Sequence, residues 1–434
     1  MATTEWVASK LEDELTANPG MLVQGIADLL MGKFGITVKK RTMYKVRSVV
    51  VEKVFGGHEE SYNFLPAYAE MIKQTNPGSW ALITWHSPYT DRLTYFNGMF
   101  VSFSAWTKGF LRGCRPIIGV DGCHLKGRFK RMLLSALSLD DNNNLFIIAY
   151  AIVGKETTES WSYFFRNFKM AFQKKGCTKW DCTFISDRMK GVEKAISNVF
   201  PTATRRICAQ HLYTNFKEKW AGPGYHDLFW KAANTTSPFV FNKAMTGIAR
   251  LSRETFAYLS NIPQQWSRHQ FDPLTTYDHN TSNFVESFNA VINDMRAKPI
   301  LVLMEEIRQY QMNKITERID IAEAMQPYDP TPYAKGIIES NCSDSGHCRV
   351  IKARGGEFEV VEGTTTAFPV NLKNETCLCG AWKVTGIPCK HACRVIYHNK
   401  EEPMQYLNGY FSGMCYKLTY SNIMHPTPDK DRWH

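Results

Sequence analysis

The sequence predicts an α/β core, and three observations within residues 115–187 support it. Residues 115–121 and 182–187 are short apolar runs, and each ends on an acid. Residues 131–139 and 145–153 are two further apolar runs joined by a turn of two Asp and three Asn, as expected of a β-hairpin. Residues 160–172 place one Trp and three Phe at helical spacing. The predicted order is therefore strand, hairpin, helix, strand.

This order, with an acid at the end of the first and last strands, is how an RNase H-like sheet begins. A third acid, Glu286, falls on a helix predicted over 283–296. Asp121 and Asp187 would lie at the same sheet edge, and carboxylate oxygens suit Mg²⁺ or Mn²⁺, which serve phosphoryl transfer in pairs. Each acid also has an ordinary alternative: Asp121 in an Asp-Gly turn, Asp187 as a helix N-cap and Glu286 as a solvated helix acid.

Residues 1–78 are helical in pattern. The segments 21–34 and 41–54 are two predicted helices separated by Gly35, an arrangement that resembles a helix-turn-helix. The second helix is basic and could face phosphates. The alternative is an ordinary helical hairpin with a solvated basic face.

The rest of the chain divides into four predicted parts. The α/β core is expected over 79–324, with a helical insertion over about 215–280. A Pro-rich break then marks the best domain boundary, and residues 325–372 are expected to form a linker with small strands. A cysteine cluster over 373–400 and a C-terminal tail over 401–434 follow.

Composition and charge limit the classes of partner. A net charge of +11 favours a polyanion, most often nucleic acid, and a merely basic protein is the alternative. No apolar run approaches the roughly eighteen residues of a membrane span, and the N-terminus lacks the features of a signal peptide. We therefore expect an intracellular protein with no membrane partner, whose twelve Cys are mostly buried thiols.

Four soft ligands have the spacing of a structural zinc site. They form two close pairs separated by nine residues: Cys377 and Cys379, then Cys389 and His391. Zinc takes four tetrahedral N/S ligands in a closed site, and the metal would supply much of the folding energy of so small a module. Cys393 lies outside these positions, and a looser group of two Cys and one His over 342–348 is expected to be structural.

Several motifs together resemble a known family. The segments GVDGCHLKG, FISDRMKGVEKAI, RRICAQHLYTNF and NTSNFVESFNAVI are similar to those of the Mutator-like (MULE) plant transposases. The segment CLCGAWKVTGIPCKHACRV is similar to the SWIM zinc finger. The resemblance implies a DDE core with Asp121, Asp187 and Glu286 as catalytic, cation-binding residues, and a structural Zn²⁺ site. Cys208 and His211 match the family's C-x-x-H motif, although alone they equally fit a buried thiol and a helix-capping imidazole.

The resemblance implies a DNA transposase that cuts and transfers strands in the nucleus, with transposon ends and target DNA as partners. The resemblance does not decide whether the protein forms a homo-oligomer. Cys123 stands where the family commonly has Thr, which is a small change. The chain also starts too late for the upstream DNA-binding module that these transposases usually carry. A fragment, a decayed copy and a domesticated descendant are therefore alternatives.

Two other functions compete with the enzyme. A domesticated, non-catalytic DNA-binding regulator would keep the fold and the zinc finger and use them to recruit partners. A nuclear scaffold held together through the SWIM module is the least favoured. Basic residues after the first strand are candidates for phosphate contacts, with a solvated hairpin face as the alternative: Lys126, Arg128, Lys130 and Arg131.

Overall fold

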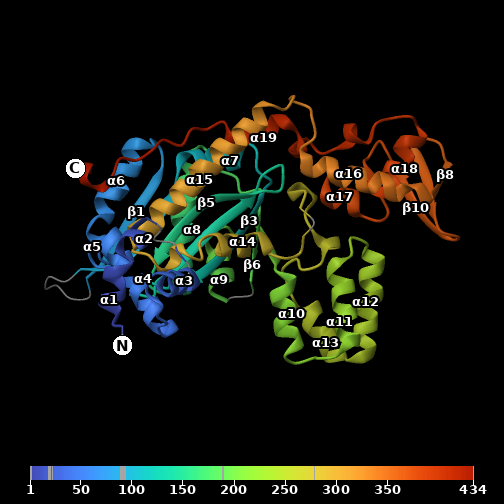
Figure 1. Ribbon diagram of the computed structural model, residues 1–434. Helices are drawn as coiled ribbons and strands as arrows, with labels where there is room; N and C mark the ends of the chain where they lie inside the picture. The colour runs from blue at the N-terminus through green and yellow to red at the C-terminus, as the bar shows by residue number, and fades with distance from the viewer. Residues whose placement is uncertain are drawn as a thin grey trace.

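The chain folds as a mixed α/β protein with a separate helical lobe and a separate C-terminal module (Figure 1). The computed structural model describes residues 2–17, 21, 23–87, 94–187, 190–277 and 279–433. Within these ranges no helix has the length and apolar character needed to cross a membrane.

The centre of the fold is a seven-stranded sheet in the order β1-β2-β5-β4-β3-β6-β7. Its strands are β1 (Trp80–His86), β2 (Tyr95–Ser102), β3 (Ile117–His124), β4 (Met132–Leu139), β5 (Leu145–Val153), β6 (Thr183–Ser186) and β7 (Thr204–Ile207). Neighbours from β1 to β3 pair antiparallel, whereas β3, β6 and β7 are parallel. The predicted α/β class and the predicted hairpin, which is β4 and β5, are both confirmed.

Strand β3 differs from the prediction near Asp121. The sequence predicts a strand that ends on this acid, whereas β3 continues to His124 because the backbone beyond Asp121 still pairs with β4. Asp121 lies opposite Ser135, so the Asp-Gly pair is part of a strand and not of a turn. The parallel pairing of β3 with β6 stops earlier, at Gly119 opposite Ile185.

Helix α8 (Thr158–Gln173) covers the sheet with its aromatic face. It begins at Thr158, two residues before the predicted start, because Thr157 and Ser160 form a capping box, in which each side chain accepts from the other residue's backbone N–H. Trp161 and Phe168 are fully buried. Helices that also contribute to this core are α6 (Leu65–Thr75), α7 (Ser104–Arg112), α9 (Lys190–Val199), α14 (Asn283–Val291) and α15 (Ile300–Glu323).

The N-terminal helices form a small bundle with its own core. They are α1 (Thr4–Lys10), α2 (Glu12–Ala17), α3 (Val23–Phe34) and α4 (Lys40–Phe55), and the short α5 (Glu60–Asn63) links them to α6. Gly35 ends α3 with a φ of +62°, a conformation that favours glycine. Val7, Ile26, Leu30 and Val46 are fully buried between the helices. A DNA-reading role for this bundle stays a prediction.

Residues after β7 form a helical lobe with a second core. The lobe contains α10 (Ala209–Lys217), α11 (Pro223–Asn234), α12 (Pro238–Leu251) and α13 (Arg253–Ser260). Phe216, Phe229 and Trp266 are buried in its centre. Figure 1 shows this lobe beside the sheet, at the end where β7 leads into α10.

The C-terminal module combines a small sheet with three helices. Its strands, in the order β11-β10-β9-β8, are β8 (Cys348–Lys352), β9 (Glu357–Glu362), β10 (Thr366–Asn371) and β11 (Thr376–Cys377). Its helices are α16 (Pro332–Asp344), α17 (Ala381–Thr385) and α18 (Lys390–His398). Helix α16 lies in the stretch predicted as a linker, where its weak amphipathic pattern gave little signal.

The last segment of the chain returns to the α/β core, although the sequence predicts a tail. Helix α19 (Gly413–Tyr420) packs on α7 and α15. The hydroxyl of Tyr420 donates to the buried Asp140 at 2.7 Å. Beyond the helix, Asn76 exchanges two hydrogen bonds with the backbone of His425, of 2.8 and 3.0 Å. These long-range contacts make residues 413–425 part of the α/β core.

Candidate metal centre and acidic site

Three thiols and one imidazole meet in the C-terminal module. The ligand atoms of Cys377, Cys379, Cys389 and His391 all lie within 4.8 Å of one another. His391 Nδ1 is 3.6 Å from Cys377 Sγ and 4.0 Å from Cys389 Sγ. Zinc bonds of about 2.3 Å to sulfur and 2.0–2.1 Å to nitrogen, at tetrahedral angles, place ligand atoms roughly 3.5–3.8 Å apart. The donor set and its spacing therefore fit a structural Zn²⁺ ion.

Local structure explains why these four residues converge. Cys377 lies in β11, and Gly380 turns the chain with a φ of +79° directly after Cys379. Cys389 precedes α18, whose first turn carries His391 inward. Strand end, turn and helix start are thus the three backbone features that bring the predicted ligands together.

Glu362 is a partner of the metal centre that the sequence analysis missed. Its carboxylate accepts from His391 Nε2 at 3.1 Å and also contacts the ammonium of Lys390. Hydrogen bonding to Lys390, and then to His391, lowers the pKa of Glu362. Because Nε2 donates to this carboxylate, Nδ1 is free to face the three thiols, as a zinc ligand requires. No spacing rule points to Glu362, since it lies in β9, far from the cysteines in sequence.

Removing this carboxylate is expected to weaken zinc binding. Glu362→Gln keeps the size of the side chain but loses the charge that orients His391, so zinc affinity should fall about 10–100-fold. Competition with a chromogenic chelator measures the change. Glu359→Gln is the matched control, because Glu359 is exposed on the same strand and should leave the affinity unchanged. Equal affinity for the two variants would contradict a role for Glu362 in orienting the ligand.

The metal centre packs against the helical lobe. Thr236, between α11 and α12, donates its hydroxyl to the backbone carbonyl of Cys379 at 2.6 Å. A Cβ on Gly380 would come within 2.2 Å of the Thr236 carbonyl oxygen, so only glycine permits this approach. The two units are therefore joined at the backbone of one zinc ligand, Cys379, and of the glycine that follows it.

Asp121 lies in β3, and Asp187 directly follows β6, the neighbouring parallel strand. Each is two residues beyond the last paired residues of β3 and β6, which are Gly119 and Ile185. Burial raises the pKa of Asp121, and the negative charge of Asp187 raises it further. The two side chains therefore interact electrostatically, as the predicted sheet edge requires.

Glu286 lies on the same side of the sheet as Asp121. Gly119 and Asp121 share one face of β3, because side chains two residues apart point the same way. Helix α14 covers this face: a Cβ on Gly119 would come within 2.4 Å of Phe284 and Val285, and Asn289 donates to Asp121 at 2.8 Å. Glu286 is exposed on this helix, one turn before Asn289.

Glu156 is a fourth acid at this edge, and the sequence analysis missed it. It follows β5, and its carboxylate accepts from Trp161 Nε1 at 3.0 Å. Burial raises the pKa of Glu156, with smaller contributions from the charges of Asp187 and Asp121. Its carboxyl group packs on Gly122, where a Cβ would come within 2.7 Å. Neither Glu156 nor Asn289 belongs to a recognisable spacing pattern, so only the fold brings them to the acids.

Cys208 and His211 stand beside the acids at the start of α10. The backbone N–H of Ser282 donates to Cys208 Sγ at 3.4 Å. Burial raises the pKa of Cys208, but hydrogen bonds from His211 and Ser282 outweigh this effect and lower it overall. Hydrogen bonding to Cys208 raises the pKa of His211 to about 9, and the charges of Asp187 and Glu286 add to the shift. We therefore expect His211 to be protonated at neutral pH, a form that the charges of two of the predicted acids favour.

The raised pKa of His211 can be tested directly. In metal-free protein, Cys208→Ser should lower the pKa of His211 from about 9 toward its ordinary 6.5, because the largest cause of the shift is removed. Titration of the imidazole by NMR measures it. Since the folded-state pKa lies above the unfolded one, the stabilising contribution is full below pH 6.5 and disappears as the pH rises through about 9. An unchanged pKa in the variant would contradict the pairing.

The acids and the metal centre differ in how closely their ligand atoms approach. Among the residues that the structure describes, the Cys–His quartet is the one group of three or more such ligands within 4.8 Å of one another. Asp121, Asp187 and Glu286 lie on one side of the sheet but are not part of such a group.

Comparison with known proteins identifies two domains in this chain. Residues 117–215 match the family model of the MULE transposase domain, a range that contains Asp121, Asp187, Cys208 and His211. Residues 368–400 match the SWIM zinc finger, a range that contains all four predicted zinc ligands.

One curated relative is also similar. Protein FAR1-RELATED SEQUENCE 6 of Arabidopsis thaliana is 24% identical over 116 residues, which cover 27% of this chain and 16% of that protein. The chain therefore spans a small part of this relative's length. The resemblance predicted from the motifs is confirmed: the chain carries a MULE transposase domain followed by a SWIM zinc finger.

Proposed function

We propose that the protein is a metal-dependent DNA transposase, with an RNase H-like core that cuts and transfers DNA strands. The strand order supports this proposal. Across the sheet, β5, β4 and β3 pair antiparallel with one another. Strands β6 and β7 lie beyond β3 and run parallel to it, as expected of an RNase H-like sheet. The matched MULE domain coincides with this part of the fold.

The observation that carries the proposal is the convergence of the acids. Asp121, Asp187 and Glu286 come from two strands and one helix, and lie on one side of the sheet around His211. Hard carboxylate oxygens fit Mg²⁺ or Mn²⁺, so these three residues would hold the cations. When bound, two such cations supply an activated attacking oxygen and a stabilised leaving oxygen.

The chain's own residues would prepare this site. Asn289 donates a hydrogen bond to Asp121 Oδ2 and would hold this carboxylate in place to bind a cation. His211 places a positive charge beside Asp187 and Glu286, and so offsets the repulsion between them before metal binds. Glu156 contributes a further carboxylate at the same edge.

Strand cleavage of DNA tests the proposal. Wild-type protein with Mg²⁺ or Mn²⁺ should nick DNA that carries the element ends, and Asp187→Ala should bind the same DNA without cutting it. Loss of cleavage with binding retained supports the enzyme. Binding to specific DNA with no cleavage by wild type in either metal would refute it.

A non-catalytic DNA-binding regulator, descended from a transposase, is the second candidate. The raised pKa of His211 favours this second candidate, because a protonated imidazole can balance the charge of neighbouring carboxylates without a metal ion. Such a protein would keep its DNA partner and its zinc site. Either function would place the protein in the nucleus, which stays a proposal, as does assembly into a homo-oligomer.

A further inference from the structure

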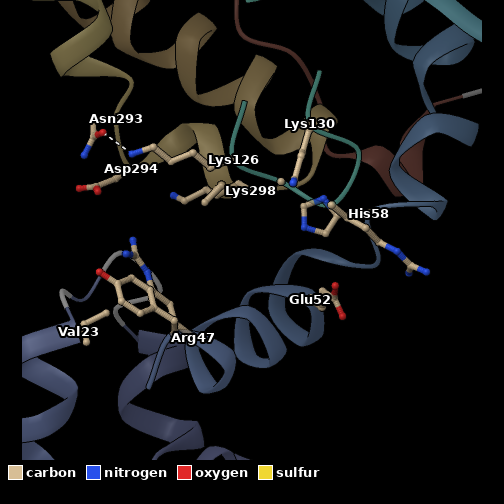
Figure 2. A pocket seen from close by; sticks show the side chains of 13 residues that line it. Val23, Arg47, Glu52, His58, Lys126, Lys130, Asn293, Asp294 and Lys298 are labelled. Atoms are coloured by element: carbon tan, nitrogen blue, oxygen red, sulfur yellow. Dashed lines mark hydrogen bonds between the residues drawn. The ribbon is translucent and has the colours of Figure 1, made fainter. Parts of the chain in front are cut away.

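A basic cleft separates the N-terminal bundle from the α/β core (Figure 2). Its volume is about 710 Å³, and five Lys or Arg side chains line it against two acids, Glu52 and Asp294. The five basic residues are Arg47, Lys126, Arg128, Lys130 and Lys298. Figure 2 shows Lys126, Lys130 and Lys298 on the core side and Arg47 on the opposite wall.

Three of these cations have no carboxylate partner. Lys298 pairs with Glu306, and Arg128 lies 3.3 Å from Glu59. Among the described residues, no carboxylate lies within 4 Å of the charged groups of Arg47, Lys126 and Lys130. These three positive charges converge on the cleft from both sides, and the five cations that line the cleft outnumber its two acids.

The loop after β3 is built to present its lysines. The backbone N–H of Lys126 donates to the Arg296 carbonyl at 2.7 Å, and its ammonium donates to Asn293 Oδ1 at 2.8 Å. Lys130 has a φ of +45°, a conformation that non-glycine residues rarely adopt. A backbone held in this way at a solvent-facing lysine points to a function at the site.

Arg131, also predicted to contact phosphate, has a different role. Its guanidinium lies 5.4 Å from the ring centroid of Phe96 and 5.9 Å from that of Tyr62. It is therefore engaged with aromatic side chains of the core, and the phosphate-contacting role passes to Arg47 from α4.

The cleft adjoins the acidic site through shared elements. Lys126 follows Asp121 by five residues along β3 and its loop, or about 16 Å of extended chain. Asn293 follows Glu286 by seven residues along α14 and its end, or about 10 Å. At a rise of about 3.4 Å per nucleotide, these distances correspond to roughly three to five nucleotides.

An exposed aromatic side chain completes the cleft. Tyr44 of α4 lines it and is 54% exposed. Proteins that bind single-stranded nucleic acid combine a basic groove with aromatic side chains on which bases stack. A duplex needs the charges but not the aromatic ring, so the combination favours a single strand.

We propose that this cleft holds a single-stranded stretch of DNA beside the acidic site. The proposal rests on the proposed function for the identity of its ligand. Arg47, Lys126 and Lys130 would contact phosphates, and Tyr44 would stack on a base. The strand would run from the cleft along β3 and α14 toward Asp121 and Glu286.

Binding measured without divalent metal tests this proposal separately from cleavage. Fluorescence anisotropy with a labelled 12-nucleotide single strand in EDTA should show that the triple variant Arg47→Ala, Lys126→Ala, Lys130→Ala binds about 10–100-fold more weakly. The slope of log K against log salt should become smaller by about 2, since each phosphate contact on a single strand contributes about 0.7. Unchanged affinity and slope would overturn the proposal, whether or not the protein cleaves DNA.

Two controls make the test specific. Replacing three exposed cations of the helical lobe, Lys231, Lys243 and Arg250, by Ala changes the net charge equally and should have little effect. If this control loses as much affinity as the triple variant, binding depends on overall charge, and the proposal that the cleft holds the strand is wrong. Tyr44→Ala should weaken single-strand binding about tenfold, whereas Tyr44→Phe should not. Equal weakening of single-strand and duplex binding by Tyr44→Ala would reject the single strand as occupant.

Discussion

Cys389→Ser should release the zinc ion and unfold the C-terminal module while the α/β core remains folded. Cys389 is buried, and its sulfur lies 4.0 Å from His391 Nδ1 within the quartet. Loss of one thiolate opens the closed site, and metal-linked folding energy in small zinc modules is of order 10 kcal/mol. The α/β core has its own hydrophobic cluster, so it does not depend on this metal.

The zinc content per chain and limited proteolysis measure the two effects. Wild type should hold one zinc ion per chain, and Cys389→Ser should hold none and be cut within the module. Cys393→Ser is the matched control, since Cys393 is buried on α18, the helix that Cys389 precedes, but its thiol donates to the Pro388 carbonyl outside the quartet. Equal zinc content in wild type and Cys389→Ser would remove the zinc assignment.

Asp121→Asn should abolish metal-dependent strand cleavage and leave DNA binding intact. The amide has the size of the carboxylate but lacks the charge that would hold a divalent cation. Loss of such a ligand should reduce the cleavage rate about 10³-fold, which corresponds to roughly 4 kcal/mol of transition-state stabilisation. Single-turnover cleavage at saturating Mn²⁺ measures the rate, and anisotropy in EDTA measures binding.

Asn289→Ala should show how the site positions this carboxylate. Its hydrogen bond opposes the effect of burial on the pKa of Asp121, so its removal should raise that pKa further. Cleavage should fall about 10–100-fold and should need a higher pH, because the carboxylate must be ionised to hold a cation. Glu339→Gln, at an exposed acid of α16, should change neither rate nor pH profile. For the Asp121→Asn variant described above, a normal cleavage rate would contradict the assignment of Asp121 as a catalytic residue.

The local chemistry of the chain determined several parts of this protein. The Cys–x–Cys and Cys–x–His spacing was enough to predict the metal centre, because each pair can chelate from a single turn. The hairpin of β4 and β5 and the aromatic face of α8 followed from periodicity and turn residues, since both depend on neighbours in sequence.

Contacts between residues that are far apart in sequence were decided by the tertiary structure. Glu362 reaches His391 from another strand, Asn289 reaches Asp121 from a helix 168 residues away, and Lys126 faces Arg47 only after two units pack together. The C-terminal helix α19 returns to the core for the same reason: its partners on α7 and α15 come from far along the chain. Residue spacing encodes contacts within a turn, a hairpin or a helix, whereas contacts between elements depend on the packing of the whole chain.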